Sequence, residues 1–287
     1  MGKADLHNHT FHSDGLFSPN ALMIKAKKKG IEHIAITDHD TISNIPQEAE
    51  LAKGFGLDFI YGCEVSAFQG GKDYHIVALD FQLDTPKFVE HFDNYFTERM
   101  QRAETMVKKF SSLGINISIE SIIEQAGNAP IGRPHVARAV VKAGYAKDSR
   151  EVFHKFLYDH GPAYQPKSNL SVKKVIELIH SAGGVAILAH PANFFNMDEI
   201  HRVVKDGIDG IEVNHPLHNQ DLRQFYGDFA QKNNLLISGG SDFHGSNDDE
   251  NNIGTSFVTE KEVAKIREAS KKIRSKPIFK HLFMKLF

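Results

Sequence analysis

Seven short apolar stretches recur along this chain, and segments with helical character lie between most of them. Short stretches rich in Val, Ile, Leu and Ala are typical of buried strands. They comprise residues 4–7, 33–37, 59–63, 74–79, 185–189, 210–213 and 236–239. Because strands alternate with helices, the pattern predicts an α/β fold around a mainly parallel sheet, either open or closed into a barrel.

Local signals mark where several of the helices begin and end. Ser18 followed by Pro19 is typical of a helix start, and Gly30 is a typical stop. Thr259 and Glu262 have the spacing of a capping box, in which each side chain bonds to the other residue's backbone. We therefore expect one helix to begin near residue 19 and the last main helix to begin near residue 260.

Residues 84–170 interrupt the alternation, because they contain no good strand. Instead they contain four helical stretches, at residues 86–113, 121–126, 134–143 and 149–158. Between residues 131 and 167, seven Lys or Arg face three Asp or Glu, which gives a local charge of +4. We interpret residues 84–170 as a basic helical insertion between two strands.

The overall composition sets limits on partners and location. The net charge is −2, so no global attraction to nucleic acid or a membrane follows. The single cysteine, Cys63, excludes an intrachain disulfide. We see no secretory leader and no apolar run of about 18 residues, so we expect a cytoplasmic protein. An amphipathic pattern at residues 278–286 favours a packed helix or subunit contact over a membrane-surface helix.

Histidine and carboxylate residues gather near the ends of the predicted strands. His7 and His9 are two residues apart at the end of the first strand, so their rings project to the same side. Asp242 and His244 have the same spacing after the last strand. Further residues of this chemistry near strand ends are His39, Glu64, His75 and His190. Because strand ends meet at one mouth of a barrel, the pattern predicts a metal site there.

His75 departs from this pattern, because it precedes its apolar stretch instead of following it. Two explanations are open. The strand that carries His75 runs in the opposite direction, or the residue reaches the site from a loop.

Several motifs together resemble those of the PHP family, named for polymerase and histidinol phosphatase. They are "DLHNHT" with "SDG", "AITDHDT", "GCEVS", the histidine at 75, "AHP" and "SDFHG". The segments "IGRPHVARAVV" and "AYQPKSNLS" are more similar to nucleoside 3′,5′-bisphosphate phosphatases, some of which also trim short RNAs from the 5′ end. The resemblance implies a distorted, TIM-like (β/α)7 barrel formed by residues 1–83 and 171–287, with residues 84–170 covering the active site.

The resemblance also implies three divalent metal ions, with ligands at nine positions of this chain. The first ion would bind His7, His9, Glu64 and Asp242. Glu64 would bridge to a second ion on His75 and His190, and the third would bind Asp14, His39 and His244. Mixed nitrogen and oxygen ligands favour Zn²⁺, Mn²⁺ or Fe²⁺ over Ca²⁺ and Mg²⁺.

Three residues of the basic insertion are candidates for phosphate binding. Arg133 offers a two-pronged donor for phosphate, and His135 and Lys167 offer further donors. Arg133 could instead cap the helix that begins at Pro134, or pair with a carboxylate. A substrate with two phosphates would place one over the metals and the other against these residues.

The leading hypothesis is a metal-dependent phosphoesterase that hydrolyses phosphate monoesters of small nucleotides, and short RNA 5′ ends, with a metal-activated hydroxide. The alternative enzyme is a histidinol-phosphate phosphatase. The alternative of another class is a non-catalytic nucleotide-binding or proofreading module. A stable duplex partner is not expected, because duplex binding needs many cationic contacts.

Four other residues near the motifs have expected supporting or neutral roles. Asp38 supports His39 or orients its loop, and Asp5 gives support at most. Glu212 lines the pocket at a strand end. We expect His12 to be an ordinary surface residue.

Overall fold

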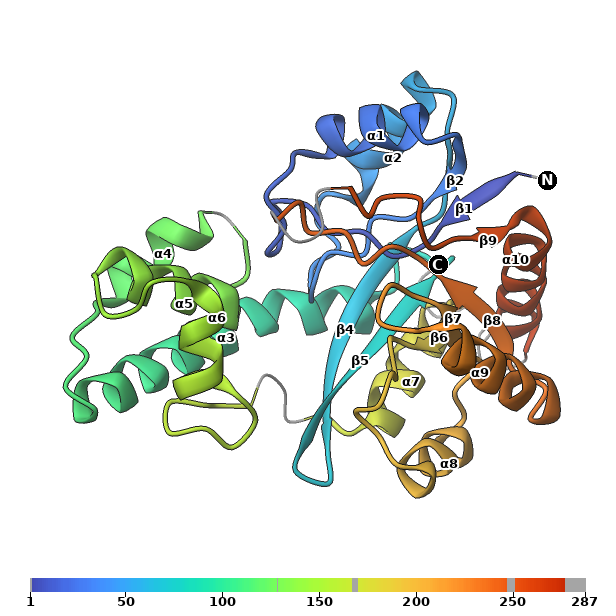
Figure 1. Ribbon diagram of the computed structural model, residues 1–287. Helices are drawn as coiled ribbons and strands as arrows, with labels where there is room; N and C mark the ends of the chain where they lie inside the picture. The colour runs from blue at the N-terminus through green and yellow to red at the C-terminus, as the bar shows by residue number, and fades with distance from the viewer. Residues whose placement is uncertain (1, 128, 167–169, 247–250, 277–287) are drawn as a thin grey trace.

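The computed structural model describes residues 2–127, 129–166, 170–246 and 251–276, and it shows a mixed α/β fold with two sheets (Figure 1). The first sheet has the strand order β3-β2-β1-β9, and the second has the order β4-β5-β6-β7-β8. The first contains β1 (Lys3–Asp5), β2 (Ile31–Ile34), β3 (Asp58–Phe59) and β9 (Val258–Thr259). The second contains β4 (Gly62–Gln69), β5 (Lys72–Leu79), β6 (Val185–Leu188), β7 (Gly210–Asn214) and β8 (Leu236–Gly239). The predicted α/β class is confirmed.

Strand β5 is antiparallel to both of its neighbours, β4 and β6, while β6, β7 and β8 are parallel. Gly70 and Gly71 connect β4 to β5, and both have positive φ, at 61° and 84°. A two-residue loop of this kind forces antiparallel pairing, and glycine adopts its backbone angles without strain. His75 lies within β5 opposite Ser66. The first explanation for His75 is therefore correct, because its strand runs in the opposite direction.

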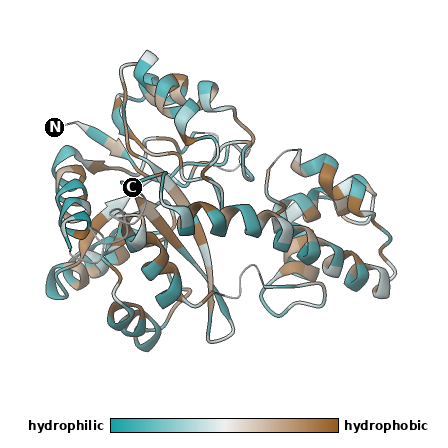
Figure 2. Cartoon of the chain, turned by 180° about the vertical axis from the view of Figure 1, so that it is seen from behind, coloured by the Kyte–Doolittle hydropathy of each residue, from teal (hydrophilic) through white to brown (hydrophobic). Residues whose placement is uncertain are grey.

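In the described part of the chain, six helices accompany the strands. They are α1 (Pro19–Lys28), α2 (Ile45–Gly54), α7 (Val172–Ser181), α8 (Met197–Asp206), α9 (Gln220–Lys232) and α10 (Glu260–Ser275). The predicted starts are confirmed: the Ser18 side chain accepts from the Ala21 backbone, and Thr259 and Glu262 form a capping box. Figure 2 shows hydrophobic residues along the central strands, whereas the helices alternate between hydrophobic and hydrophilic positions. The helices thus cover the sheets with their apolar faces.

Residues 86–157 form helices that lie to one side of the sheets (Figure 1). They are α3 (Pro86–Ser112), α4 (Ile119–Ala126), α5 (Arg133–Lys142), α6 (Ser149–Val152) and a π-helical turn (Phe153–Leu157). The start of α3 packs Phe88 into the core of the five-stranded sheet, whereas Phe110, near its end, belongs to a separate apolar cluster of these helices. Helix α3 therefore joins the two apolar cores.

None of the helices in the described part of the chain is long and apolar enough to cross a membrane. The amphipathic pattern at residues 278–286 lies outside the described residues.

Candidate metal centre

The loops that follow β1 and β8 run side by side, and this pairing brings two of the sequence motifs together. The His9 backbone donates to Phe243 O at 2.8 Å, and the Asp242 backbone donates to His7 O at 2.9 Å. His7 and His9 are fully buried. Backbone pairing thus places the two histidines of the first motif against Asp242 and His244 of the last motif.

Four side chains meet around one point between these loops and β4. The Nε2 atoms of His7 and His9 each lie 3.3 Å from Glu64 Oε2. Asp242 Oδ1 lies 3.4 Å from His7 Nε2 and 3.1 Å from His9 Nε2. Four ligands bonded to one ion at about 2.1 Å in a tetrahedron are separated by roughly 3.4 Å. The four atoms therefore have spacings that fit a shared metal ion.

Hydrogen bonding gives a second test of fit. His7 Nε2, both ring nitrogens of His9 and Glu64 Oε2 are buried, and none has a hydrogen-bond partner among the described residues. Leaving several buried polar atoms unsatisfied is costly, and native structures contain few of them. A cation at this point would satisfy the atoms that face it.

The other oxygen of Glu64 takes part in a second group. Glu64 Oε1 lies 2.9 Å from His75 Nδ1 and 3.0 Å from His190 Nε2. The two ring nitrogens are 3.2 Å apart. Because one carboxylate oxygen faces each group, Glu64 has the arrangement of a bridging ligand.

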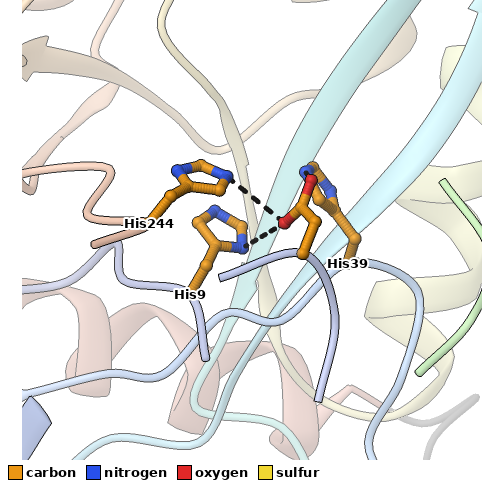
Figure 3. Close-up of side chains that lie close together, drawn as sticks. His9, His39 and His244 are labelled. Atoms are coloured by element: carbon orange, nitrogen blue, oxygen red, sulfur yellow. Dashed lines mark ion pairs between the residues drawn. The ribbon is translucent and has the colours of Figure 1, made fainter. Parts of the chain in front are cut away.

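A third group surrounds the carboxylate of Asp14. Asp14 lies 3.3 Å from His244 Nε2, 3.7 Å from His39 Nε2 and 3.9 Å from His9 Nδ1. Figure 3 shows the rings of His9, His39 and His244 gathered around one carboxylate. His9 thus faces the first group with one ring nitrogen and the third with the other. All nine residues proposed as ligands from the sequence lie in one contiguous cluster.

The cluster keeps its carboxyl groups ionised. Burial alone would raise the pKa of Glu64, yet the charges of His39, His75 and His7 hold it well below its usual range. Burial opposes ionisation of Asp14 in the same way, and His39 and His244 hold its pKa well below the usual range. Buried carboxylates that stay charged are suited to binding cations.

Residues 5–206 match the family model of the PHP domain. The chain belongs to the PHP family. A 5′-3′ exoribonuclease of Haemophilus influenzae is 32% identical over 248 residues, which cover 84% of this chain and 90% of that protein. A 3′,5′-nucleoside bisphosphate phosphatase of Chromobacterium violaceum is 31% identical over 260 residues, which cover 88% of this chain and 91% of that protein.

A solved structure has the same fold. The protein is from Bifidobacterium adolescentis and is classed by inference as a metal-dependent phosphoesterase. The two structures superimpose with a TM-score of 0.83 at 28% sequence identity. The superposition covers 93% of this chain and 96% of the Bifidobacterium chain. Together with the phosphatase and the nuclease, it shows that this PHP protein is a metal-dependent phosphoesterase.

Glu212 in β7 and His215 just after it contact residues proposed as ligands, whereas the sequence pattern placed Glu212 only in the wall of the pocket. Glu212 Oε1 lies 2.9 Å from His7 Nδ1, and Glu212 Oε2 accepts from the His190 backbone at 2.7 Å. His215 is a further residue of the site, and its Nε2 lies 3.3 Å from Asp242 Oδ2. The signal was present, because "NHP" after β7 repeats the "AHP" that follows β6. Partners of this kind fix the ring orientation of a ligand.

We expect Glu212→Gln to weaken metal binding by about 10- to 100-fold, because the carboxylate that orients His7 is lost. Titration of the metal-free protein against a competing chelator measures the change. Asp209→Asn is the matched control, because Asp209 makes a similar contact with His180 at 2.7 Å outside the cluster. Equal effects of the two substitutions would contradict an orienting role for Glu212.

Asp38 and Asp5 support the loops that carry the ligands. Asp38 accepts from the Thr10 backbone at 2.8 Å and from the Ser13 hydroxyl at 2.5 Å, so it holds the loop before Asp14. This is the loop-orienting role, one of the two considered for Asp38. Asp5 accepts from the Ser241 backbone at 2.9 Å and so positions the chain before Asp242.

The three candidates for phosphate binding have different surroundings. Arg133 Nη1 contacts Asp159 at 2.8 Å and Leu157 O at 3.1 Å, so this guanidinium already pairs with a carboxylate. It nevertheless lines the clefts beside the metal ligands. His135 is buried, and its Nδ1 accepts from the Gly132 backbone at 2.9 Å at the start of α5. Lys167 lies outside the described residues.

The environment of His135 predicts a specific loss of stability in acid. Burial and the nearby charge of Arg138 lower the pKa of His135 from 6.5 to about 4. As the pH falls from 6.5 toward 4, His135 therefore gains a proton in the unfolded chain before it does so in the folded protein. The folded state loses stability in this pH range. Linkage gives a loss of about 2 kcal/mol at pH 5 from this residue.

His135→Asn keeps an acceptor for the Gly132 backbone but removes the titrating ring. We expect this variant to lose about 2 kcal/mol less than the wild type between pH 7.5 and pH 5, measured by urea unfolding. His201→Asn, on the exposed face of α8, should show the wild-type loss. A parallel pH dependence of His135→Asn and the wild type would contradict the buried neutral state.

Proposed function

We propose that this enzyme hydrolyses phosphate monoesters of small nucleotides such as nucleoside 3′,5′-bisphosphates, with short RNA 5′ ends as a second substrate class. One observation carries the proposal. A cleft of about 140 Å³ is lined both by members of the ligand cluster, Asp14, His39 and His75, and by the arginines Arg99 and Arg133. Metal ligands and arginines facing one small space suit a phosphate group.

The proposed ligand sets follow the three groups of side chains. His7, His9, Glu64 and Asp242 would hold one ion, Glu64, His75 and His190 a second, and Asp14, His39 and His244 a third. Zn²⁺, Mn²⁺ and Fe²⁺ suit these mixed nitrogen and oxygen donors. Bound ions supply an acidified water and neutralise charge on the phosphoryl oxygens.

The chain's own residues would position the ester and the ligands. Arg133 donates to phosphate oxygens at the wall of the cleft. Glu212 keeps the His7 ring turned so that Nε2 faces Glu64 and Asp242, where an ion would be held. Asp38 holds the loop that presents Asp14. Each of these groups acts by orientation and charge, which is how phosphoryl-transfer sites gain most of their rate.

We further propose that the two sheets form one distorted (β/α)7 barrel, with residues 84–170 as an insertion over its mouth. Two isolated parallel bridges support this view, because Asn8 pairs with Phe243 and His39 pairs with Glu64. These bridges link the segments that follow β1 and β8, and the segment that follows β2 to β4, so that β1, β2 and β4–β8 would form a ring of seven strands. The ligand cluster would then lie at the mouth of the barrel, where active sites of such folds occur.

Phosphate release from three substrates tests the function. The purified protein is loaded with Mn²⁺, Zn²⁺ or Fe²⁺ and assayed with adenosine 3′,5′-bisphosphate, a 5′-phosphorylated dinucleotide and histidinol phosphate. We expect hydrolysis of the bisphosphate, with a chelator abolishing it. A clear preference for histidinol phosphate would replace the proposal with the alternative phosphatase. Nucleotide binding without hydrolysis, unchanged in His9→Ala, would indicate a non-catalytic module.

A further inference from the structure

A second, larger cleft of about 360 Å³ lies next to the ligand cluster. His75 and His190, which belong to the cluster, form part of its wall. Arg133 lines both this cleft and the smaller one that faces Asp14 and His39. A molecule in the larger cleft would therefore have one end beside the metal ligands and Arg133.

One wall of the larger cleft is aromatic. Phe194 and Phe195 follow His190 closely in the chain and both line the cleft. Phe195 is already stacked, with its ring 4.3 Å from that of Tyr74 and an interplanar angle of 13°. Phe194 is 56% exposed, although its backbone oxygen accepts a hydrogen bond from Lys72 Nζ at 3.3 Å. The Phe194 ring is thus an exposed apolar surface on an anchored segment, and a flat ring stacked on it would remove it from water.

The same cleft contains a buried acceptor. Asp73 lines it, and the Asp73 side chain is only 6% exposed. Its Oδ2 pairs with Arg133 Nη2 at 3.5 Å and the carboxylate interacts with the Tyr164 hydroxyl, but neither oxygen accepts a hydrogen bond of normal geometry from the described residues. A buried carboxylate with free acceptor capacity favours a ligand that carries hydroxyl donors.

We propose that this cleft is the nucleoside subsite of the enzyme, in which the base stacks on Phe194 and the sugar hydroxyls donate to Asp73. An aromatic face, a carboxylate and a nearby arginine match the base, the sugar and the phosphate of a nucleotide in turn. The inference rests on the proposed function. In this view, Phe194 and Asp73, which are not metal ligands, make the enzyme prefer nucleotides over other phosphate esters.

Binding of two ligands that differ only in the base tests this subsite. The phosphonate analogues of adenosine 5′-monophosphate and ribose 5-phosphate, in which a methylene group replaces the ester oxygen and blocks hydrolysis, are titrated by calorimetry into the metal-loaded protein. Base stacking on an aromatic side chain contributes roughly 5- to 150-fold in affinity, so we expect the ligand with the base to bind at least about 5-fold more tightly. Phe194→Ala should reduce this ratio to about 1 to 2, and Phe194→Tyr should preserve it.

Phe225→Ala is the matched control, because Phe225 is also exposed, at 44%, but lies on α9 and does not line the cleft. Asp73→Asn should weaken both ligands by a similar factor of about 5, because both carry the sugar hydroxyls. A ratio that is unchanged in Phe194→Ala would overturn the base site, and unchanged affinities in Asp73→Asn would overturn the sugar contact. These binding measurements do not depend on hydrolysis. A protein that shows the expected ratio of affinities but hydrolyses no phosphate ester would therefore contradict the proposed function and leave the nucleoside subsite standing.

Discussion

Glu64→Gln should reduce kcat for phosphate release by about 1000-fold or more and should remove bound metal. Glu64 contacts all three groups of ligands, since its oxygens lie 3.3 Å from His7 and His9, 2.9 Å from His75 and 3.1 Å from His39 Nδ1. Replacing this carboxylate with a neutral amide removes the charge that two ions would share. Metal ions supply several kcal/mol of transition-state stabilisation, and each 1.4 kcal/mol corresponds to about tenfold in rate.

The control for this substitution is Glu48→Gln, a change of the same kind elsewhere in the protein. Glu48 lies on α2 and is only 3% exposed, and burial together with the charge of Asp38 raises its pKa to about 9. It is therefore uncharged at pH 7, where glutamine is a close mimic. We expect near-normal activity and metal content for Glu48→Gln. If Glu64→Gln retains its metals and its rate, the bridging role of Glu64 is wrong.

Arg99→Met should lower the free energy of unfolding by about 3–5 kcal/mol, because it removes one partner of a buried ion pair. Arg99 of α3 pairs with Asp40 at the loop after β2, and both side chains are at most 1% exposed. Arg99 Nη1 also donates to Ile131 O at 2.8 Å, just before α5. The substitution leaves a buried carboxylate without its guanidinium and loosens the link between the helices of residues 86–157 and the metal centre. Urea unfolding measures the loss.

Arg267→Met is the matched control for stability. Arg267 pairs with Asp58 at 2.7 Å, but both side chains are 38% exposed. Pairs as exposed as this one contribute about 0–1 kcal/mol, so the control should lose no more than about 1 kcal/mol. Similar losses in the two variants would show that burial does not strengthen the Arg99–Asp40 pair.

The approximate positions of most strands and the place of the site were predictable from local patterns, although the stretch at residues 59–63 spans the end of β3 and the start of β4, and β9 was not expected. Apolar stretches locate strands, and His7, Glu64, His190 and Asp242 follow or lie on them. Because strand ends converge in folds of this kind, residues far apart in sequence could be grouped from the sequence alone. The reversal of β5, one of the two explanations open for His75, also has a local signal in Gly70-Gly71.

Other features could not be read from local patterns, because they depend on how distant segments pack. Arg99 and Asp40 are 59 residues apart, and Glu212 and His7 are 205 residues apart. Nothing in the sequence neighbourhood of Arg99 distinguishes it from an exposed helical arginine. The placement of His9 between two ligand groups depends equally on the ring orientation that its neighbours impose. Pairing partners of this kind require the three-dimensional structure.

Anomalous X-ray scattering from crystals of the metal-loaded protein tests the central claim most directly. Data collected at the absorption edges of manganese, iron and zinc locate each bound ion and identify its element. We expect three peaks, one within each group of ligands, with Glu64 between two of them. A protein that shows no anomalous peak in this cluster after loading would contradict the metal-dependent site.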